Sequence, residues 1–108
     1  DLSHSQKFIF IIPEYNGSYP GVLKAFIDSL DHLSMAGKKA CLIGLSSGHA
    51  GALRALDHIT CVLHHLKIEV YSNKPKLSGI DKLIDETEIV DVQTIKRLEV
   101  MLKGFMSF

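Results

Sequence analysis

An apolar run that leads directly into a turn-rich nonapeptide constrains the fold of this chain more than any other feature. Residues 8–12 (FIFII) are apolar without a break, as in a strand that is covered on both faces of a parallel sheet. Pro13 ends this strand because it has no N–H to donate to a neighbour. Residues 13–21 (PEYNGSYPG) form a loop, and a helical pattern starts at Val22. This order places the loop at the carboxyl end of a strand, where open α/β sheets bind ligands.

The nonapeptide combines backbone freedom with several polar groups. Gly17 and Gly21 lack a Cβ and therefore allow a ligand to approach the backbone closely. Pro20 fixes φ at a value suited to a first helical turn. A carboxylate, a phenol, an amide and a hydroxyl lie in the same stretch. We expect the backbone N–H groups of residues 14–19 to be available to a ligand.

Apolar residues recur with strand and helix spacings along the rest of the chain. The pattern predicts strands at residues 7–12, 40–45 and 68–71, and helices at residues 21–33, 51–66 and 92–105. Residues 72–88 are polar and turn-rich, and we expect a surface loop there. Strands that alternate with helices imply parallel pairing and right-handed crossovers. The sequence therefore predicts a three-layer, doubly wound α/β sheet.

Length and charge narrow the class of protein. The 108 residues are enough for one domain. Twelve basic and twelve acidic residues give a formal net charge of zero, so no nucleic-acid footprint is expected. The longest apolar run is too short to cross a bilayer, and we expect no signal peptide, because no basic segment precedes an apolar one. Cys41 and Cys61 are too few for a disulfide scaffold, and we expect both to be buried reduced thiols of a cytoplasmic protein.

Two segments resemble the signature loops of a known enzyme family. Residues 13–28 (PEYNGSYPGVLKAFID) resemble the first loop of the NADPH-dependent FMN reductase family, which includes flavin, quinone, chromate and azo-dye reductases. Residues 44–52 (GLSSGHAGA) are similar to the family's second loop, G-x-S-x-G-x-x-G-G, and depart from it at Ala52, where a second glycine is usual. The resemblance implies a flavodoxin-like fold that binds FMN, with NADPH or NADH as co-substrate.

The resemblance also implies which residues contact the flavin. These residues are Pro13, Glu14, Tyr15 and Asn16 in the first loop and Ser46, Ser47 and Gly48 in the second. In such enzymes the cofactor supplies the hydride chemistry, while the protein holds the ring and places hydrogen-bond donors around it. We therefore assign no catalytic side chain. Each polar residue also has a structural alternative: a solvated carboxylate, a packed loop aromatic, a turn amide or a helix-capping hydroxyl.

Several residues near these loops have competing interpretations. Ser18 is a candidate cap for the helix that follows it. Lys24 and Asp28 are four residues apart in the less favourable order for a helical ion pair, so we expect a solvated face. His49 either borders the nicotinamide and substrate site or is an exposed loop residue. Arg54 either reaches a phosphate of NADPH, pairs across a subunit boundary or lies in a surface ion pair.

Three histidines fall on one predicted helix, at positions 58, 64 and 65. Zinc sites on helices favour pairs of ligands four residues apart. Adjacent residues such as His64 and His65 point about 100° apart around a helix and do not easily share an ion. We therefore expect no metal site.

The resemblance covers only part of a flavodoxin-like domain. From about Lys7 onward the motifs match the third, fourth and fifth strands of the family fold. No segment matches the first strand or the Ser/Arg-rich loop that binds the FMN phosphate. We therefore expect residues 1–108 to form a single flavodoxin-like domain that is the C-terminal part of a longer one. The alternative is a short form whose open edge, at residues 8–12, pairs with another protomer.

Three functions are compatible with these features. The leading prediction is an FMN-dependent NAD(P)H oxidoreductase that transfers hydride through flavin N5 to a flavin, quinone, azo or metal-oxyanion acceptor. The zero net charge disfavours a flavodoxin-like electron carrier, whereas the missing phosphate loop favours a flavin-free truncated interaction module. The resemblance implies a homodimer or homotetramer, with Leu33 and Met35 as candidate contacts. Neither a nucleic acid nor a membrane is expected as a partner.

Overall fold

The sheet is parallel and is built around one central strand. A computed structural model describes residues 4–108. The strands are β1 (Lys7–Pro13), β2 (Lys39–Leu45), β3 (Glu69–Val70) and β4 (Lys76–Leu77). β2 pairs with β1 along its whole length, and on its other side it pairs first with β3 and then with β4. β3 and β4 therefore occupy one interrupted strand position, and β4 lies in the segment that the sequence predicted to be a surface loop.

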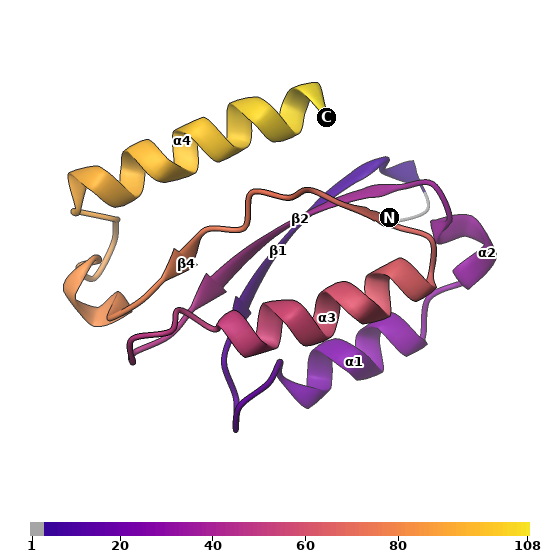
Figure 1. Ribbon diagram of the computed structural model, residues 1–108, viewed down its shortest axis with the longest axis horizontal. Coiled ribbons are helices and arrows are strands. Elements are labelled where there is room, and N and C mark those ends of the chain that lie inside the picture. The colour runs from indigo at the N-terminus through magenta and orange to yellow at the C-terminus, as the bar shows by residue number, and fades with distance from the viewer. Residues whose placement is uncertain (1–3) are drawn as a thin grey trace.

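Helices cover both faces of the sheet. α1 (Gly21–Asp28) and α3 (Leu53–His65) lie against one face, and α4 (Val92–Ser107) lies against the other (Figure 1). Two short elements, α2 (His32–Met35) and the 3₁₀ turn η2 (Ile80–Lys82), complete the chain. These three layers confirm the predicted doubly wound α/β architecture.

Side chains alternate between two hydrophobic clusters along β2, because successive strand residues point to opposite faces. Ala40 and Leu42 belong to the larger cluster, which α1 and α3 cover, whereas Cys41 and Ile43 belong to the smaller cluster under α4. Burial raises the pKa of the Cys41 thiol to about 11. Cys61 is exposed, so the expectation that both thiols are buried was wrong for this residue.

The helix predicted at residues 21–33 is divided into two. α1 ends at Asp28, and the hydroxyl of Ser29 donates a 2.6 Å hydrogen bond to the Phe26 carbonyl. The Asp31 carboxylate then caps α2 by accepting from the Leu33 N–H at 3.1 Å. Short polar side chains at these positions satisfy the backbone locally, which ends one helix and starts another despite the continuing apolar period.

Lys24 and Asp28 on α1 lie on a solvated face, as expected, and they also form an ion pair, which was not expected. Lys24 Nζ lies 3.0 Å from Asp28 Oδ1. The hydrogen bond and the charge of Asp28 raise the pKa of Lys24. Both side chains remain well exposed, so the pair contributes little to stability.

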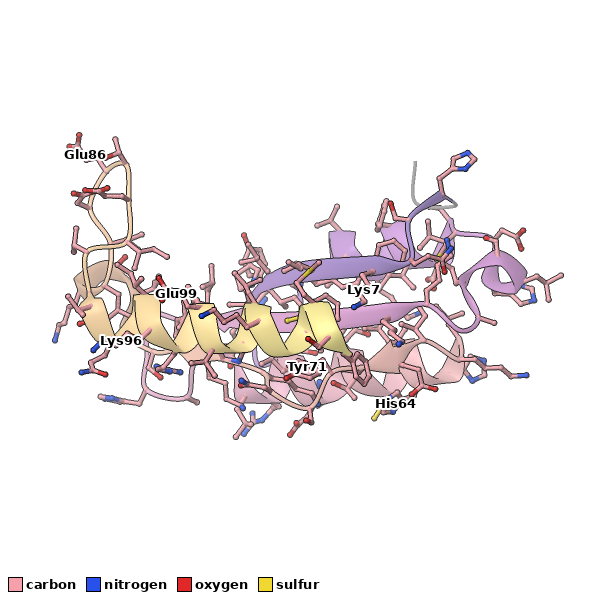
Figure 2. All side chains as sticks on the ribbon, turned by 90° about the horizontal axis from the view of Figure 1, so that it is seen from above. Lys7, His64, Tyr71, Glu86, Lys96 and Glu99 are labelled. Atoms are coloured by element: carbon pink, nitrogen blue, oxygen red, sulfur yellow. The ribbon has the colours of Figure 1, made fainter. Side chains whose placement is uncertain are left out.

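Two lysines fix the carboxyl-terminal end of α4. Lys7 Nζ donates to the carbonyl oxygens of Phe105 at 2.9 Å and Met106 at 2.8 Å. Lys39 Nζ donates to the carbonyl oxygen of Phe108. Figure 2 shows Lys7 beside the final turns of the helix. The Phe105 carbonyl also accepts from the Phe108 N–H at 3.1 Å. The ammonium groups add donors to carbonyls of the last turn, which otherwise lack their full set of helical partners, and complement the helix dipole.

The outer edge of β1 has no partner strand within residues 4–108. Phe8 and Ile12 are buried under α1 and α3, but Ile9 is 48% and Ile11 61% exposed on the α4 side. The expectation that this strand is covered on both faces was therefore wrong for the described chain. None of the helices in this range is both long and apolar enough to cross a membrane.

Candidate functional site

Two loops begin side by side at the carboxyl end of the sheet. The first loop (residues 14–20) follows β1, and the second loop (residues 46–52) follows β2. Pro13 and Leu45 are paired in register, and the Glu14 N–H donates to the Leu45 carbonyl at 3.1 Å. Both loops leave the same end of the paired strands (Figure 1). The sequence-predicted flavin residues of the two loops are therefore brought to one edge of the sheet.

The first loop contains a tight hairpin turn. Tyr15 and Ser18 exchange two backbone hydrogen bonds of 2.8 and 3.0 Å. Asn16 and Gly17 between them have φ of 50° and 82°, as a type I′ turn requires. Asparagine followed by glycine is the pair that adopts this geometry at least cost. The turn therefore fixes the conformation of the first loop without a ligand.

Several backbone N–H groups that were expected to be available to a ligand are used within this loop. The N–H groups of Glu14, Tyr15 and Ser18 donate to backbone carbonyls, so the expectation of six available donors was wrong for these three. The N–H groups of Asn16, Gly17 and Tyr19 have no acceptor among residues 4–108. Two of the three donors that this loop can offer to a ligand thus lie in its turn.

The side chains of residues 14–16 in the first loop lie on the surface. Tyr15 is 60% exposed, and Glu14 and Asn16 are also exposed. The structural alternative for Tyr15, a packed loop aromatic, is therefore excluded, and its ring is accessible to another planar group.

α3 supports the first loop from one side. Ser18 Oγ lies 2.7 Å from Nδ1 of His58. A Cβ added to Gly17 would lie 3.5 Å from a guanidinium nitrogen of Arg54, which places that side chain against the turn. Ser18 does not cap α1, because the cap position is Pro20 and no side chain bonds there. Sequence reasoning missed His58 as a support for the loop, since its partner is 40 residues away.

The second loop is held by the segment that follows β4. The Ser46 N–H donates to Leu77 O at 3.1 Å, and the Ile80 N–H donates back to Ser46 O at 3.0 Å. The Gly79 N–H donates to Gly48 O at 2.9 Å. Ser46 Oγ accepts from the Gly48 N–H rather than capping α3. The strand and turn that hold this loop were missed from sequence.

Backbone donors remain available in the second loop as well. The N–H groups of Ser47, His49 and Ala50 have no acceptor within residues 4–108, and all three residues are exposed. The carbonyl of His49 is fixed by a 2.6 Å hydrogen bond from Ser78 Oγ. This loop therefore presents donors from a backbone that is held on one side.

Ala52 adopts a left-handed conformation, with φ of 67°. The family pattern has glycine at this position, and the structure supplies the physical reason, since only glycine takes positive φ without strain. Alanine does not block the turn here, and its methyl group is fully buried in the larger core cluster.

A depression of about 280 Å³ lies between the first loop and the start of α3. Its lining residues are Glu14, Ala50, Leu53, Arg54 and Asp57. Glu14 alone among the seven predicted flavin residues lines it. Within residues 4–108 no group of three or more His, Cys, Asp or Glu side chains is arranged to hold a metal ion.

Known proteins share both the sequence and this architecture. The sequence pattern of one family, described as NADPH-dependent FMN reductase, matches residues 2–78. The chain is 31% identical to an NAD(P)H-dependent FMN reductase of Schizosaccharomyces pombe over 99% of its length and 52% of that protein. It is 35% identical to a quinone reductase of Escherichia coli over 93% of its length and 56% of that protein. The chain thus spans about half the length of these curated relatives.

Solved structures agree with the sequence relatives. FerB, a flavoenzyme NAD(P)H:(acceptor) oxidoreductase from Paracoccus denitrificans, superposes with a TM-score of 0.85 at 29% identity, over 98% of this chain and 62% of that one. The apo form of an NADH:FMN oxidoreductase, EMOB, superposes with a TM-score of 0.67 at 23% identity, over 95% of this chain and 53% of that one, which shows the fold alone. With the sequence match, the chain belongs to the NADPH-dependent FMN reductase family and has its flavodoxin-like fold.

Proposed function

We propose that this chain is the part of an FMN-dependent NAD(P)H oxidoreductase that holds the isoalloxazine ring, through Pro13, Glu14, Tyr15, Asn16, Ser46, Ser47 and Gly48. The observation that carries the proposal is the pair of adjacent loops, both fixed by hydrogen bonds and both presenting unused backbone N–H groups at one sheet edge. Membership of the flavin reductase family supports this assignment.

The residues present suit a planar cofactor with polar edges. The N–H groups of Asn16 and Ser47 are donors that do not titrate, and they come from loops that are already ordered. The exposed ring of Tyr15 offers a stacking surface. FMN, when bound, would supply hydride acceptance and donation at N5. We therefore assign positioning and hydrogen bonding to this chain, and no proton transfer to any of its side chains.

The two loops offer no positive charge to the cofactor's phosphate. Neither residues 14–20 nor residues 46–52 include lysine or arginine. We propose that a further segment, beyond these 108 residues, binds the phosphate and adds a strand to β1. The unpaired edge of β1 and the exposed Ile9 and Ile11 support this proposal, because proteins rarely leave such an edge open.

We further propose a cytoplasmic homodimer or homotetramer that reduces a small-molecule acceptor such as a flavin, a quinone, an azo compound or a metal oxyanion. The relatives named as quinone and FMN reductases support this substrate class. Leu33 is 77% exposed and suits a subunit contact, whereas Met35 is buried in the core, so its expected role at an interface was wrong.

The test is an FMN titration of the chain, followed by anaerobic addition of NADPH and then of air. We expect a bound-flavin absorbance spectrum that bleaches with NADPH and recovers in air. Tyr15→Ala should weaken FMN binding by about tenfold, which corresponds to one aromatic contact of about 1.4 kcal/mol. Phe26→Ala is the control: it also removes a partly exposed aromatic ring, but on α1 and outside the two loops, and it should leave FMN binding unchanged.

Two results would contradict the proposal. Riboflavin, which has the same ring without the phosphate, is titrated beside FMN, and absence of a spectral shift with both would show that this chain does not hold the ring and would favour the flavin-free interaction module. Equal loss of FMN binding in the Tyr15 and Phe26 variants would show that the two loops are not the site.

A further inference from the structure

A second hollow lies on the side of β2 opposite to β1. Its volume is about 390 Å³, and it is lined by residues of the β3–β4 connection, of the start of β4 and of α4: Asn73, Lys74, Pro75, Lys76, Lys96, Arg97 and Val100. We call it the basic groove. Figure 2 shows Lys96 on the amino-terminal half of α4. None of these residues belongs to the two loops of the candidate flavin site.

The lining of the basic groove is strongly cationic. Four of its seven residues carry a positive charge, and none carries a carboxylate. The whole chain has equal numbers of basic and acidic residues, so this concentration does not follow from composition. Among residues 4–108, none of the four cations lies within 4.0 Å of a carboxylate oxygen. None of the four therefore forms an ion pair within the described chain.

Hydrogen bonds to neutral oxygens hold three of these cations in place. Arg97 Nη2 donates to Lys76 O at 3.2 Å, and Lys76 Nζ donates to Lys74 O at 3.1 Å. Lys74 Nζ donates to Thr60 Oγ1 of α3 at 3.1 Å, so this ammonium group is directed towards the other face of the sheet. The side chain of Lys76 also leaves β4 on that face, because the next residue, Leu77, packs in the cluster under α4. The cations that remain available to a ligand beside α4 are therefore Lys96 and Arg97, and the guanidinium group of Arg97 retains further N–H donors.

The carboxylate of Asp91, which interacts with the charge of Arg97, is engaged in capping α4. Asp91 caps α4, and its pKa is lowered first by the hydrogen bonds from Thr94 and, to a smaller extent, by the charge of Arg97. Lys96 makes no hydrogen bond within the described chain, and it is exposed. A ligand that enters the groove would therefore meet Lys96 and the outer donors of Arg97 without displacing a protein carboxylate.

We propose that the basic groove binds a nucleoside diphosphate. Lys96 and Arg97 on α4 suit two linked phosphates, since lysine and arginine are the side chains that recognise phosphate oxygens. Val100 provides an exposed apolar surface for the base, and the amide of Asn73 provides a donor and an acceptor for its polar edge. The volume lies within the range of small-molecule sites. The proposal does not rest on the proposed flavin function.

The experiment measures binding of fluorescently labelled ADP to the full chain by anisotropy at fixed ionic strength. Lys96→Glu reverses one charge without breaking any hydrogen bond, and it should weaken binding by more than about tenfold. Lys82→Glu makes the same change in net charge at an exposed position outside the groove and should leave binding unchanged. Unlabelled ADP should compete, whereas adenosine and inorganic phosphate should compete far more weakly.

Three outcomes of this experiment would overturn the proposal. Equal losses in the two lysine variants would show general charge attraction, and equal competition by phosphate and ADP would show a simple anion site. Absence of binding at millimolar ADP would exclude the site. Lys96→Glu should also leave the FMN spectral change unaltered, so failure here and failure of the proposed flavin site are distinguishable.

Discussion

Ser18 Oγ lies 2.7 Å from His58 Nδ1, and this contact ties the hairpin turn of the first loop to the middle of α3. α3 packs on the sheet through fully buried residues such as Leu56 and Ile59. The position of the first loop is therefore fixed relative to the hydrophobic core. This arrangement matters for a binding site, because ordering a loop on binding would cost conformational entropy that a fixed loop has already lost.

Removing the Ser18–His58 contact should weaken flavin binding without unfolding the chain. A net hydrogen bond of about 0.5–1.5 kcal/mol predicts a two- to tenfold loss of FMN affinity in Ser18→Ala. His58→Ala should cause a similar loss, and the double variant should lose no more than either single one. FMN titration of the four proteins checks this, and additive losses would contradict a shared contact.

Gly44→Ala should destabilise the chain by about 1–3 kcal/mol through overpacking. A Cβ at Gly44 would lie 2.3 Å from the Gly51 carbonyl oxygen, which belongs to the backbone of the second loop. Gly21→Ala is the matched control, because a Cβ there meets nothing within 4 Å. Urea unfolding measures both, and equal midpoints would show that the second loop moves freely away from β2.

Lys67→Gly should raise the free energy of unfolding by up to about 1 kcal/mol. Lys67 has φ of 62° just after α3, where its N–H bonds His64 O and the next N–H bonds Leu63 O in a Schellman motif. Lys96→Gly makes the same change inside α4 and should lower stability by about 1 kcal/mol. Changes of the same sign in thermal melts would contradict this assignment.

The two cysteines should differ sharply in reactivity. Cys61 is exposed, whereas Cys41 is buried and has a pKa raised to about 11. A thiol reagent at neutral pH should modify one thiol in the native chain and two in denaturant. Because the folded pKa of Cys41 is the higher one, ionisation should destabilise the fold only as pH rises from its ordinary value of 9.0 towards 11. Rapid native modification of two thiols would refute this assignment.

Asp91 should stabilise α4 in a pH-dependent way. Hydrogen bonds from Thr94 lower the pKa of its carboxyl below the ordinary value of 3.8. Its contribution is therefore complete above that value and is lost as pH falls through the lower folded pKa. Asp91→Ala should lower the melting temperature at pH 7, and the difference from the parent chain should shrink in acid. Thr94→Val removes one of the same donors and should reduce the pH dependence.

The strands and helices that form the core were predictable because they have strong apolar patterns. β1, β2, α3 and α4 all follow uninterrupted runs or helical spacings. β4 was missed because it has only two residues, Lys76 and Leu77, in a polar segment. The break after α1 was missed because Leu30 and Leu33 continue the helical period across Ser29 and Asp31, whose side-chain hydrogen bonds end the helix.

The site was predictable only in part. The order of the motifs located both loops, but the donors that remain available depend on the Asn16–Gly17 turn and on bonds to Leu77 and Gly79. The basic groove had no sequence signal, because its cations come from two segments about twenty residues apart. Contacts between distant segments follow from packing, which a local pattern does not contain.

The hydrogen bonds from Lys7 to Phe105 and Met106 at the end of α4 connect residues that are separated by 98 and 99 positions in the sequence. A ribosome releases the chain from its amino terminus, so β1, β2 and the helices that cover their first face emerge long before α4. During this interval Ile43 and its neighbours on the second face remain uncovered in the nascent chain. The layer formed by α4 can close only after synthesis of that helix, so translation itself sets the earliest time at which this fold is protected from aggregation.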